Sequence, residues 1–457
     1  MTGTTTMTAL TVADAQAVAD RVVELVRSKA LDAETEVTVR GGTDALTRFA
    51  NSFIHQNVAE SVSHLLVRVA VDGRTAATSL DGPTDDETLG RVIDGVLEAA
   101  RVRPEDPDWP GVSPRAEAPR VDHWDEATAA ASPDERARRV RDFVDAAGGL
   151  ETAGACSTEA ATVAFANSAG QRLSGRATLA DLDGIARTPT SDGSGRLSAA
   201  RVDAIDGRVL GERAATKARG AADPTDLEPG RYEVVLEPYC VANLVQFLFV
   251  YGFNGRPVEE GRSFVKLGER QLDESIDLRD DVTDPGQVGV PFDVEGTPRR
   301  RVDVVTAGVT KAILHTRRTA ARAGVESTGH AVEGGEQWGA LPTNSVLSPG
   351  ERSPEALVGG VERGLLVTDL WYTRVLDPRT LVVTGLTRNG VWLVENGRIV
   401  RPVKNLRFTQ SYIEALAPDA IRGIGSDASL ISGGFGGSYL VPSLHLASWN
   451  FTGGARG

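Results

Sequence analysis

Hydrophobic and polar residues follow two different periods along the N-terminal part of the chain. Apolar side chains recur every three or four residues between positions 12 and 29, which predicts an amphipathic helix packed on a sheet. Residues 34–40 alternate between the two classes, and residues 46–58 and 63–71 also have the pattern of β-strands. Asp72-Gly73 then predicts a tight hairpin turn. This segment is therefore expected to place a helix on a sheet.

Two helix-capping signals follow. Residues 84–87 (TDDE) predict the start of a helix that runs to about position 101, and residues 132–135 (SPDE) predict a second one that ends near position 149. The proline-rich residues 104–119 between them predict a surface connection. Short strands and turns are expected from residue 150 to residue 205.

The second half of the chain is predicted to be mainly β. Residues 224–230 (PTDLEPG) mark a boundary, after which come a strand at 232–236 and a helix-like stretch at 238–254. Further strand-like runs are residues 301–305, 309–314, 365–370, 380–387 and 391–400, the last one with a turn at Asn396-Gly397. A barrel or a curled sheet is the natural way to close so many strands.

The predicted fold class is α+β. Residues 1–223 are expected to form an N-terminal α/β domain with helices on a mixed sheet. Residues 224–457 are expected to form a mainly-β, barrel-like domain that carries a buried helix.

Composition narrows the function classes. The chain has 457 residues and a net charge of -14, which disfavours nucleic-acid binding because phosphate contacts need clustered Lys and Arg. No apolar run reaches the roughly 20 residues that cross a bilayer, and residues 1–8 show no secretory signal. Cys156 and Cys240 are therefore expected to be buried thiols rather than a disulfide. We expect a cytoplasmic protein without nucleic-acid or membrane partners.

The helix-like stretch has an unusual distribution of apolar residues. Between positions 244 and 253 nearly every side of the helix is apolar or aromatic, which indicates burial in a core or against a partner. Phe247 and Tyr251 are candidates for a dimer interface, where large apolar side chains often anchor a partner. A core helix is the plainer interpretation, and the two are compatible.

Several phrases along the chain resemble the TldD/PmbA family of metalloproteases, in the order in which the family has them. They are residues 47–57 (TRFANSFIHQN), 165–170 (FANSAG), 291–298 (PFDVEGTP), 314–321 (LHTRRTAA), 326–330 (ESTGH) and 394–399 (VENGRI). The segment that ends at residues 261–263 (GRS) is similar to the one that carries His-Glu-x-x-x-His in this family. The resemblance implies a metallopeptidase-type fold and a protein that acts on unstructured peptides.

The metal motif is where this sequence departs from the family. Its histidine positions fall on Gln246 and Tyr251, and its glutamate position falls on Phe247. None of these side chains is an imidazole, thiolate or carboxylate, the groups that hold zinc and activate its water. Residues 424–437 also lack the cysteine that the family's catalytic subunit has near its C-terminus. The resemblance is therefore to the TldE (PmbA) type of subunit, with no metal and no catalytic residue on this chain.

That resemblance implies partners and a possible groove. The expected partner is a TldD-like metalloprotease subunit that carries zinc, and the expected substrate is a peptide. His330, Phe253 and the glycine-rich Gly434, Phe435 and Gly436 are candidates for a substrate groove or an interface.

Two other interpretations stay open from the sequence. A divergent metallopeptidase could act alone through unconventional ligands such as His330, His445 or the acidic loop at 273–285. A homodimeric binding module would have no protease partner at all.

Overall fold

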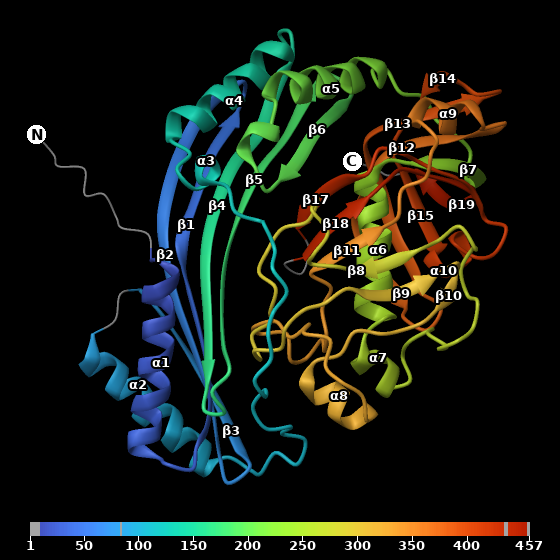
Figure 1. Ribbon diagram of the computed structural model, residues 1–457. Coiled ribbons are helices and arrows are strands. Elements are labelled where there is room, and N and C mark those ends of the chain that lie inside the picture. Colours follow the sequence, from blue (N-terminus) through green and yellow to red (C-terminus); the bar gives the residue numbers. More distant parts are fainter. Residues whose placement is uncertain (1–9, 83–84, 434–436, 455–457) are drawn as a thin grey trace, which may run out of the picture.

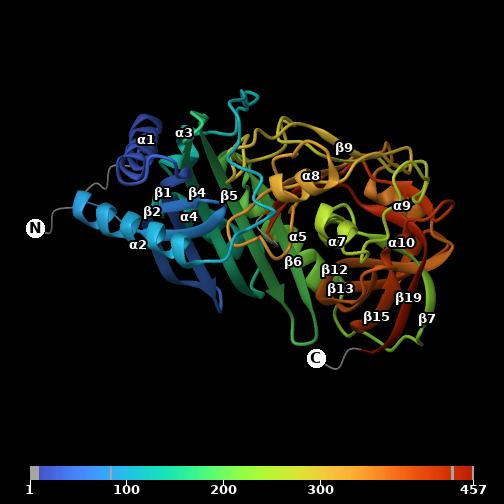
Figure 2. The ribbon, with the colours of Figure 1, turned by 90° about the horizontal axis from the view of Figure 1, so that it is seen from below.

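The computed structural model describes residues 10–82, 85–433 and 437–454, which form two halves that lie side by side (Figures 1 and 2). The N-terminal half is built on a six-stranded sheet with the order β3-β2-β1-β4-β5-β6. Its strands are β1 (Glu34–Ala50), β2 (Phe53–Val71), β3 (Arg74–Asp81), β4 (Glu151–Asn167), β5 (Arg172–Arg187) and β6 (Asp192–Ala199).

Tight turns determine the topology of this sheet. Asn51 and Ser52 both adopt positive φ and join β1 to β2, so the predicted strand at 46–58 is in fact a hairpin. Asp72-Gly73 makes the predicted turn between β2 and β3, again with positive φ at both residues. The α+β class is confirmed, but this sheet is antiparallel throughout and not mixed: hairpins join β1 to β2, β2 to β3, β4 to β5 and β5 to β6, and the distant strands β1 and β4 also pair antiparallel.

Helices cover one face of the sheet. They are α1 (Val12–Lys29), α2 (Asp86–Val102), α3 (Glu126–Ala129), α4 (Pro133–Ala146) and α5 (Gly207–Gly220), with a 3-10 turn at Val202–Ala204. Val37 and Val39 of β1 pack in the core with α1 and α2. Farther along the same strand, Phe49 meets Phe143 of α4 with ring centroids 5.6 Å apart. Because side chains alternate along a strand, the neighbouring position Glu36 points to the opposite face, toward the C-terminal half.

The C-terminal half contains a closed ring of strands. β12 (Arg363–Asp377), β7 (Gly230–Leu236), β19 (Leu444–Gly454), β15 (Leu406–Ser411) and β13 (Val382–Glu395) pair in this order, and β13 pairs back to β12. β14 (Arg398–Pro402) and β16 (Ile421–Ile424) extend the ring. Such a ring matches the expected barrel-like C-terminal part.

A second sheet packs beside the ring. Its strands are β8 (Leu278–Asp280), β9 (Val302–Thr306), β10 (Val309–Thr310), β11 (Asn344–Leu347), β17 (Ser429–Gly433) and β18 (Gly437–Val441). Short helices lie around it and the ring: α7 (Gly255–Glu259), α8 (Arg317–Ala323), α9 (Pro354–Gly359) and α10 (Tyr412–Ala415).

Helix α6 (Pro238–Tyr251) lies between the ring and the second sheet, in contact with β7 and β12 on one side and β17 and β18 on the other. Pro238 occupies its first turn, where a missing N–H costs nothing. Nine of its fourteen residues are buried, so this is the buried helix that its apolar sequence indicated. No helix among the described residues is long and apolar enough to cross a membrane.

Charged side chains join the two halves. Arg68 of β2 donates to Glu36 at 3.1 Å and lies 3.3 Å from Glu336 and 3.9 Å from Glu295 of the C-terminal half. Arg318 of α8 pairs with Asp106 in the proline-rich connection. The boundary at 223/224 remains a prediction about independent domains, since these contacts span it.

Candidate functional site

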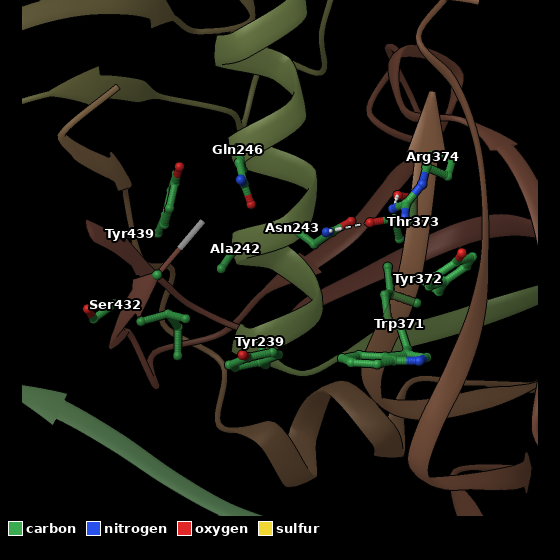
Figure 3. A pocket seen from close by; sticks show the side chains of 13 residues that line it. Tyr239, Ala242, Asn243, Gln246, Trp371, Tyr372, Thr373, Arg374, Ser432 and Tyr439 are labelled. Atoms are coloured by element: carbon green, nitrogen blue, oxygen red, sulfur yellow. Dashed lines mark hydrogen bonds between the residues drawn. The ribbon is translucent and has the colours of Figure 1, made fainter. Parts of the chain in front are cut away.

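A cavity of about 340 Å³ opens over α6 (Figure 3). Its floor is one face of the helix, because Tyr239, Ala242, Asn243 and Gln246 follow the i, i+3, i+4, i+7 spacing that aligns side chains on a helix. In Figure 3, α6 runs between two groups of residues, Ser432 and Tyr439 on one side and residues 371–374 of β12 on the other. Such a volume lies near the lower end of the ~300–1,000 Å³ that ligand pockets have.

A bulge in β12 shapes one wall of the cavity. Trp371 pairs with Leu386 and Arg374 pairs with Thr384, so Tyr372 and Thr373 together oppose a single residue of β13. Tyr372 adopts φ of 54°, a conformation that is rare for a bulky side chain. As a result Trp371 and Tyr372 are 50% and 64% exposed at the cavity mouth instead of alternating between core and solvent.

Two arginines stack on these aromatic rings. The Arg374 guanidinium lies 4.3 Å from the Tyr372 ring centroid, and the Arg388 guanidinium lies 4.5 Å from that of Trp371. Such contacts contribute roughly 0.5–1 kcal/mol at exposed sites. Only Arg374 of the two lines the cavity, and it forms no ion pair with another described residue. It is also the one charged side chain among the described residues of the lining.

Hydrogen bonds hold part of the floor. Tyr412 Oη donates to Asn243 Oδ1 at 2.9 Å, and Asn243 Nδ2 donates to Thr373 Oγ1 at 3.1 Å. The amide of Asn243 is therefore held toward β12, as Figure 3 shows. The hydroxyl of Tyr439 is different, because it is buried and has no hydrogen-bond partner among the described residues. Burial also raises the pKa of Tyr439, so the hydroxyl keeps its proton and remains a donor.

Next to Tyr239, one arginine binds two carboxylates and supports the floor of the cavity. Arg196 of β6 donates to Asp369 at 2.7 Å and to Asp183 at 2.6 Å, and its guanidinium lies 4.2 Å from the Tyr239 ring centroid. Burial raises the pKa of Asp369, and Arg196 together with Asn389 opposes that shift by favouring the carboxylate. These carboxylates are thus engaged with Arg196 behind the floor and do not line the cavity.

The donor set of the cavity does not fit a metal ion. Its described lining contains hydroxyls, amides and one guanidinium but no His, Cys, Asp or Glu, the usual ligands of zinc. Elsewhere in residues 10–82, 85–433 and 437–454, no three of these side chains lie close enough together to hold a metal. The arrangement suits hydrogen bonding to an acceptor-rich molecule instead.

The three positions aligned with the metal motif have separate environments. Gln246 is half-buried and faces the cavity. Phe247 is buried and stacks on Tyr251 at 5.7 Å, with its ring edge-to-face against Tyr412 at 6.0 Å. Tyr251 also meets Trp338 edge-to-face at 6.4 Å. Phe247 and Tyr251 are therefore parts of an aromatic cluster beside the cavity, and only Gln246 reaches its interior.

Two of the predicted groove residues are in the core. Phe253 is 0% exposed and packs edge-to-face on Phe249 and Phe264, at 5.7 and 5.4 Å. His330 is also 0% exposed, with Nε2 3.0 Å from Asp280 Oδ1 and Nδ1 2.8 Å from Thr328 Oγ1. Both side chains complete the packing of the C-terminal core, and their groove or interface role stays a prediction.

The carboxylate beside His330 is structural as well. Asp280 Oδ2 accepts hydrogen bonds from the backbone N–H groups of Thr343 and Asn344 at 3.1 and 3.0 Å. Burial acts to raise the pKa of Asp280, but His330 and these N–H groups outweigh it and leave the pKa below its ordinary value. Asp280 therefore ties β8 to the start of β11 and to the segment between α8 and β11 that carries His330.

Gly434, Phe435 and Gly436 lie outside the described residues, although their neighbour Gly433 lines the cavity. Sequence reasoning missed the β12 wall and Tyr439. A usable signal was the run Trp371-Tyr372-Thr373-Arg374, in which large side chains do not alternate as they would in a regular strand.

One protein-family model matches the C-terminal half of the chain. Residues 229–453 match the PmbA/TldA metallopeptidase C-terminal domain.

This match spans just under half of the chain, so the C-terminal half is similar to this family's domain.

Curated proteins named as metalloproteases are also similar to this chain. A "Metalloprotease" of Methanothermobacter thermautotrophicus is 25% identical over 227 residues, 49% of this chain and 48% of that protein. A "Metalloprotease TldD homolog" of Buchnera aphidicola is 25% identical over 211 residues, 45% of this chain and 42% of that protein. The chain thus matches less than half the length of these curated relatives.

Solved structures resemble the whole chain in fold. TldE from Thermococcus kodakarensis has a TM-score of 0.86 at 19% identity, covering 95% of this chain and 99% of that one. A putative modulator of a DNA gyrase from Thermotoga maritima has a TM-score of 0.82 at 20% identity, again covering 95% and 99%. Both halves described here therefore belong to one known architecture.

Proposed function

We propose that this chain is a non-catalytic, TldE-like subunit of a two-subunit metalloprotease. The observation that carries the proposal is the cavity over α6, the helix whose sequence resembles the metal-motif segment of the PmbA/TldD family. Its described lining offers no zinc ligand and no carboxylate to act as a base. In this proposal zinc and peptide hydrolysis belong to a TldD-like partner, and the substrate is an unstructured peptide.

The packing of α6 supports the proposal physically. A glutamate at position 247 would bury a carboxylate among the rings of Tyr251 and Tyr412, which costs free energy because the charge leaves water. A histidine at position 251 would replace a ring that packs on Trp338. The helix is thus built as a core element whose aromatic contacts exclude the metal motif at two of its three positions.

Similarity of fold to a solved TldE structure also supports the proposal. The likeness to TldE of Thermococcus kodakarensis extends over 95% of this chain, so the architecture is retained although the cavity lacks metal-binding side chains. In the proposed pair, this subunit contributes the shape of a substrate channel and the stability of the assembly.

The test uses the chain alone and together with a TldD-type protein of the same organism. Each is purified separately and after co-expression, and zinc content and cleavage of an unstructured peptide are measured. We expect far less than one equivalent of zinc and no cleavage for the lone chain, with co-purification and cleavage for the pair.

Two results would contradict the proposal. One equivalent of zinc together with peptidase activity in the lone chain would show a divergent enzyme that acts on its own. Failure of the two proteins to associate, with full activity of the TldD-type protein by itself, would leave this chain as a separate binding module.

A further inference from the structure

The cavity over α6 has an excess of hydrogen-bond donors. Tyr439 Oη is buried without a partner, and the Gln246 amide faces the cavity with no hydrogen bond to a described residue. An unpaired buried donor costs about 1–3 kcal/mol, and an acceptor that enters the cavity removes this penalty. A ligand rich in oxygen acceptors is therefore favoured over one that brings further donors.

The described lining of the cavity carries positive charge and no negative charge. Arg374 is the single charged residue of the described lining, and one of its nitrogens donates to the Thr373 carbonyl at 2.8 Å. A guanidinium has five N–H donors, so most of them remain for a ligand. The two carboxylates that Arg196 binds, Asp369 and Asp183, are not among the described lining residues. An anionic group is thus attracted to the β12 wall, and a cationic one is not.

We propose that this cavity is a non-hydrolytic docking site for a peptide that bears a carboxylate. The carboxylate binds Arg374 on the β12 wall, and peptide carbonyls accept from Gln246 and Tyr439. The inference rests on the proposed function for the class of ligand, a peptide of the protease pair. No bond is made or broken in the cavity, so the peptide is held and not cleaved.

The exposed rings at the mouth fit the same ligand. Trp371 and Tyr372 are half or more exposed and held by stacked arginines, so they offer flat apolar surfaces beside the Arg374 charge. Aromatic side chains of this kind anchor ligands at little cost in conformational entropy. The cavity volume of about 340 Å³ admits the end of an extended chain and excludes a folded domain.

The experiment measures fluorescence anisotropy of short unstructured peptides, labelled at the N-terminus, with the purified full chain. Two peptides share one sequence and end in a free C-terminal carboxylate or in an amide, and a third, also amidated, has glutamate in place of the last residue. We expect the first to bind about tenfold more tightly than the amidated peptide, because a charge-assisted hydrogen bond is lost in the latter. The third peptide shows whether a side-chain carboxylate is accepted equally.

Two variants and a matched control locate the site. Arg374→Met keeps an unbranched chain over Tyr372 but removes the charge, and it should abolish the preference for a carboxylate. Tyr439→Phe removes only the unpartnered hydroxyl, so it should weaken all three peptides several-fold without lowering the thermal midpoint. Arg388→Met removes an equivalent stacked charge that does not line the cavity, and it should retain the preference.

Specific outcomes would overturn the inference. Equal binding of the free and amidated peptides, equal effects of Arg374→Met and Arg388→Met, or no binding to a correctly folded chain would each do so. Displacement of bound peptide by the TldD-type protein would assign the cavity to the subunit interface and would also overturn it. The proposed function is tested separately by zinc content and cleavage, so a pair that cleaves while this chain binds no peptide refutes only the inference.

Discussion

Glu36 gives the sharpest prediction about stability. It is 3% exposed at the junction of the two halves, and its Oε1 has no hydrogen-bond partner among the described residues. Burial raises its pKa from the ordinary 4.5 to about 8, and Arg68 only partly opposes this. Arg68 is less effective than in a simple pair because it also faces Glu295 and Glu336.

The sign of the pH dependence follows from these values. A carboxyl group with a raised pKa binds its proton more tightly in the folded state, so its contribution to stability is complete below pH 4.5. That contribution is lost as the pH rises toward about 8. The interval between the two pKa values corresponds to about 5 kcal/mol at about 1.4 kcal/mol per pH unit, an upper limit because the folded chain relaxes around the charge.

The perturbation is Glu36→Gln, which keeps the shape of the protonated side chain. We expect the variant and the parent to have similar free energies of unfolding at pH 4.5, and the variant to be more stable by several kcal/mol at pH 8. Urea unfolding followed by circular dichroism between pH 4.5 and pH 8.5 measures the difference. Glu159→Gln is the control, since its carboxylate pairs with Arg40 but is 39% exposed, and it should change stability by less than about 1 kcal/mol.

A different result would refute the reasoning. If Glu36→Gln is less stable than the parent at pH 8, then the ion pair with Arg68 outweighs desolvation and Glu36 is ionised in the folded chain. A stability difference that does not vary with pH would show that the group titrates alike in the folded and unfolded states.

Three other predictions concern the C-terminal half. Phe247→Ala should destabilise the chain by about 3–5 kcal/mol in urea unfolding, whereas Gln246→Ala should be close to neutral, because only Phe247 is buried among rings; equal effects would contradict the described helix face. Cys156 and Cys240 are buried thiols whose pKa values burial raises, so a thiol reagent should label neither in the native chain and both after unfolding. Asp280→Asn should cost about 3–5 kcal/mol at pH 7, since it removes a buried charge from its partners, and unchanged urea midpoints would exclude that role.

The sequence predicted much of the fold because local signals agree with the tertiary structure. The helix at 12–29, the turns at Asp72-Gly73 and Asn396-Gly397, and the buried helix all occur where periodicity and turn chemistry indicated them. The hairpin at Asn51 and Ser52 was missed, because neither residue is a glycine although both adopt positive φ. Pairing directions are set by contacts between distant segments, and for this reason the mixed N-terminal sheet was a wrong prediction.

The site was less predictable for a related reason. Periodicity shows that α6 is buried but not which of its faces meets a cavity. Gln246 lines the cavity whereas its neighbour Phe247 packs on Tyr412, and this difference depends on the segments packed around the helix. His330 follows a family-like phrase and suggested a groove, yet its imidazole serves a buried pair with Asp280. Trp371 and Arg374 reach the cavity through a bulge, a feature that sequence alternation does not specify.

The position of β19 has a consequence for biosynthesis. This strand, the last one described, lies between β7 and β15, so the ring has a gap until residues 444–454 have emerged from the ribosome. The antiparallel sheet of residues 34–199 has no such requirement and is free to assemble during translation, as N-terminal units generally do. Nascent chains arrested before residue 444 should therefore resist a protease in their first half while the second half is digested.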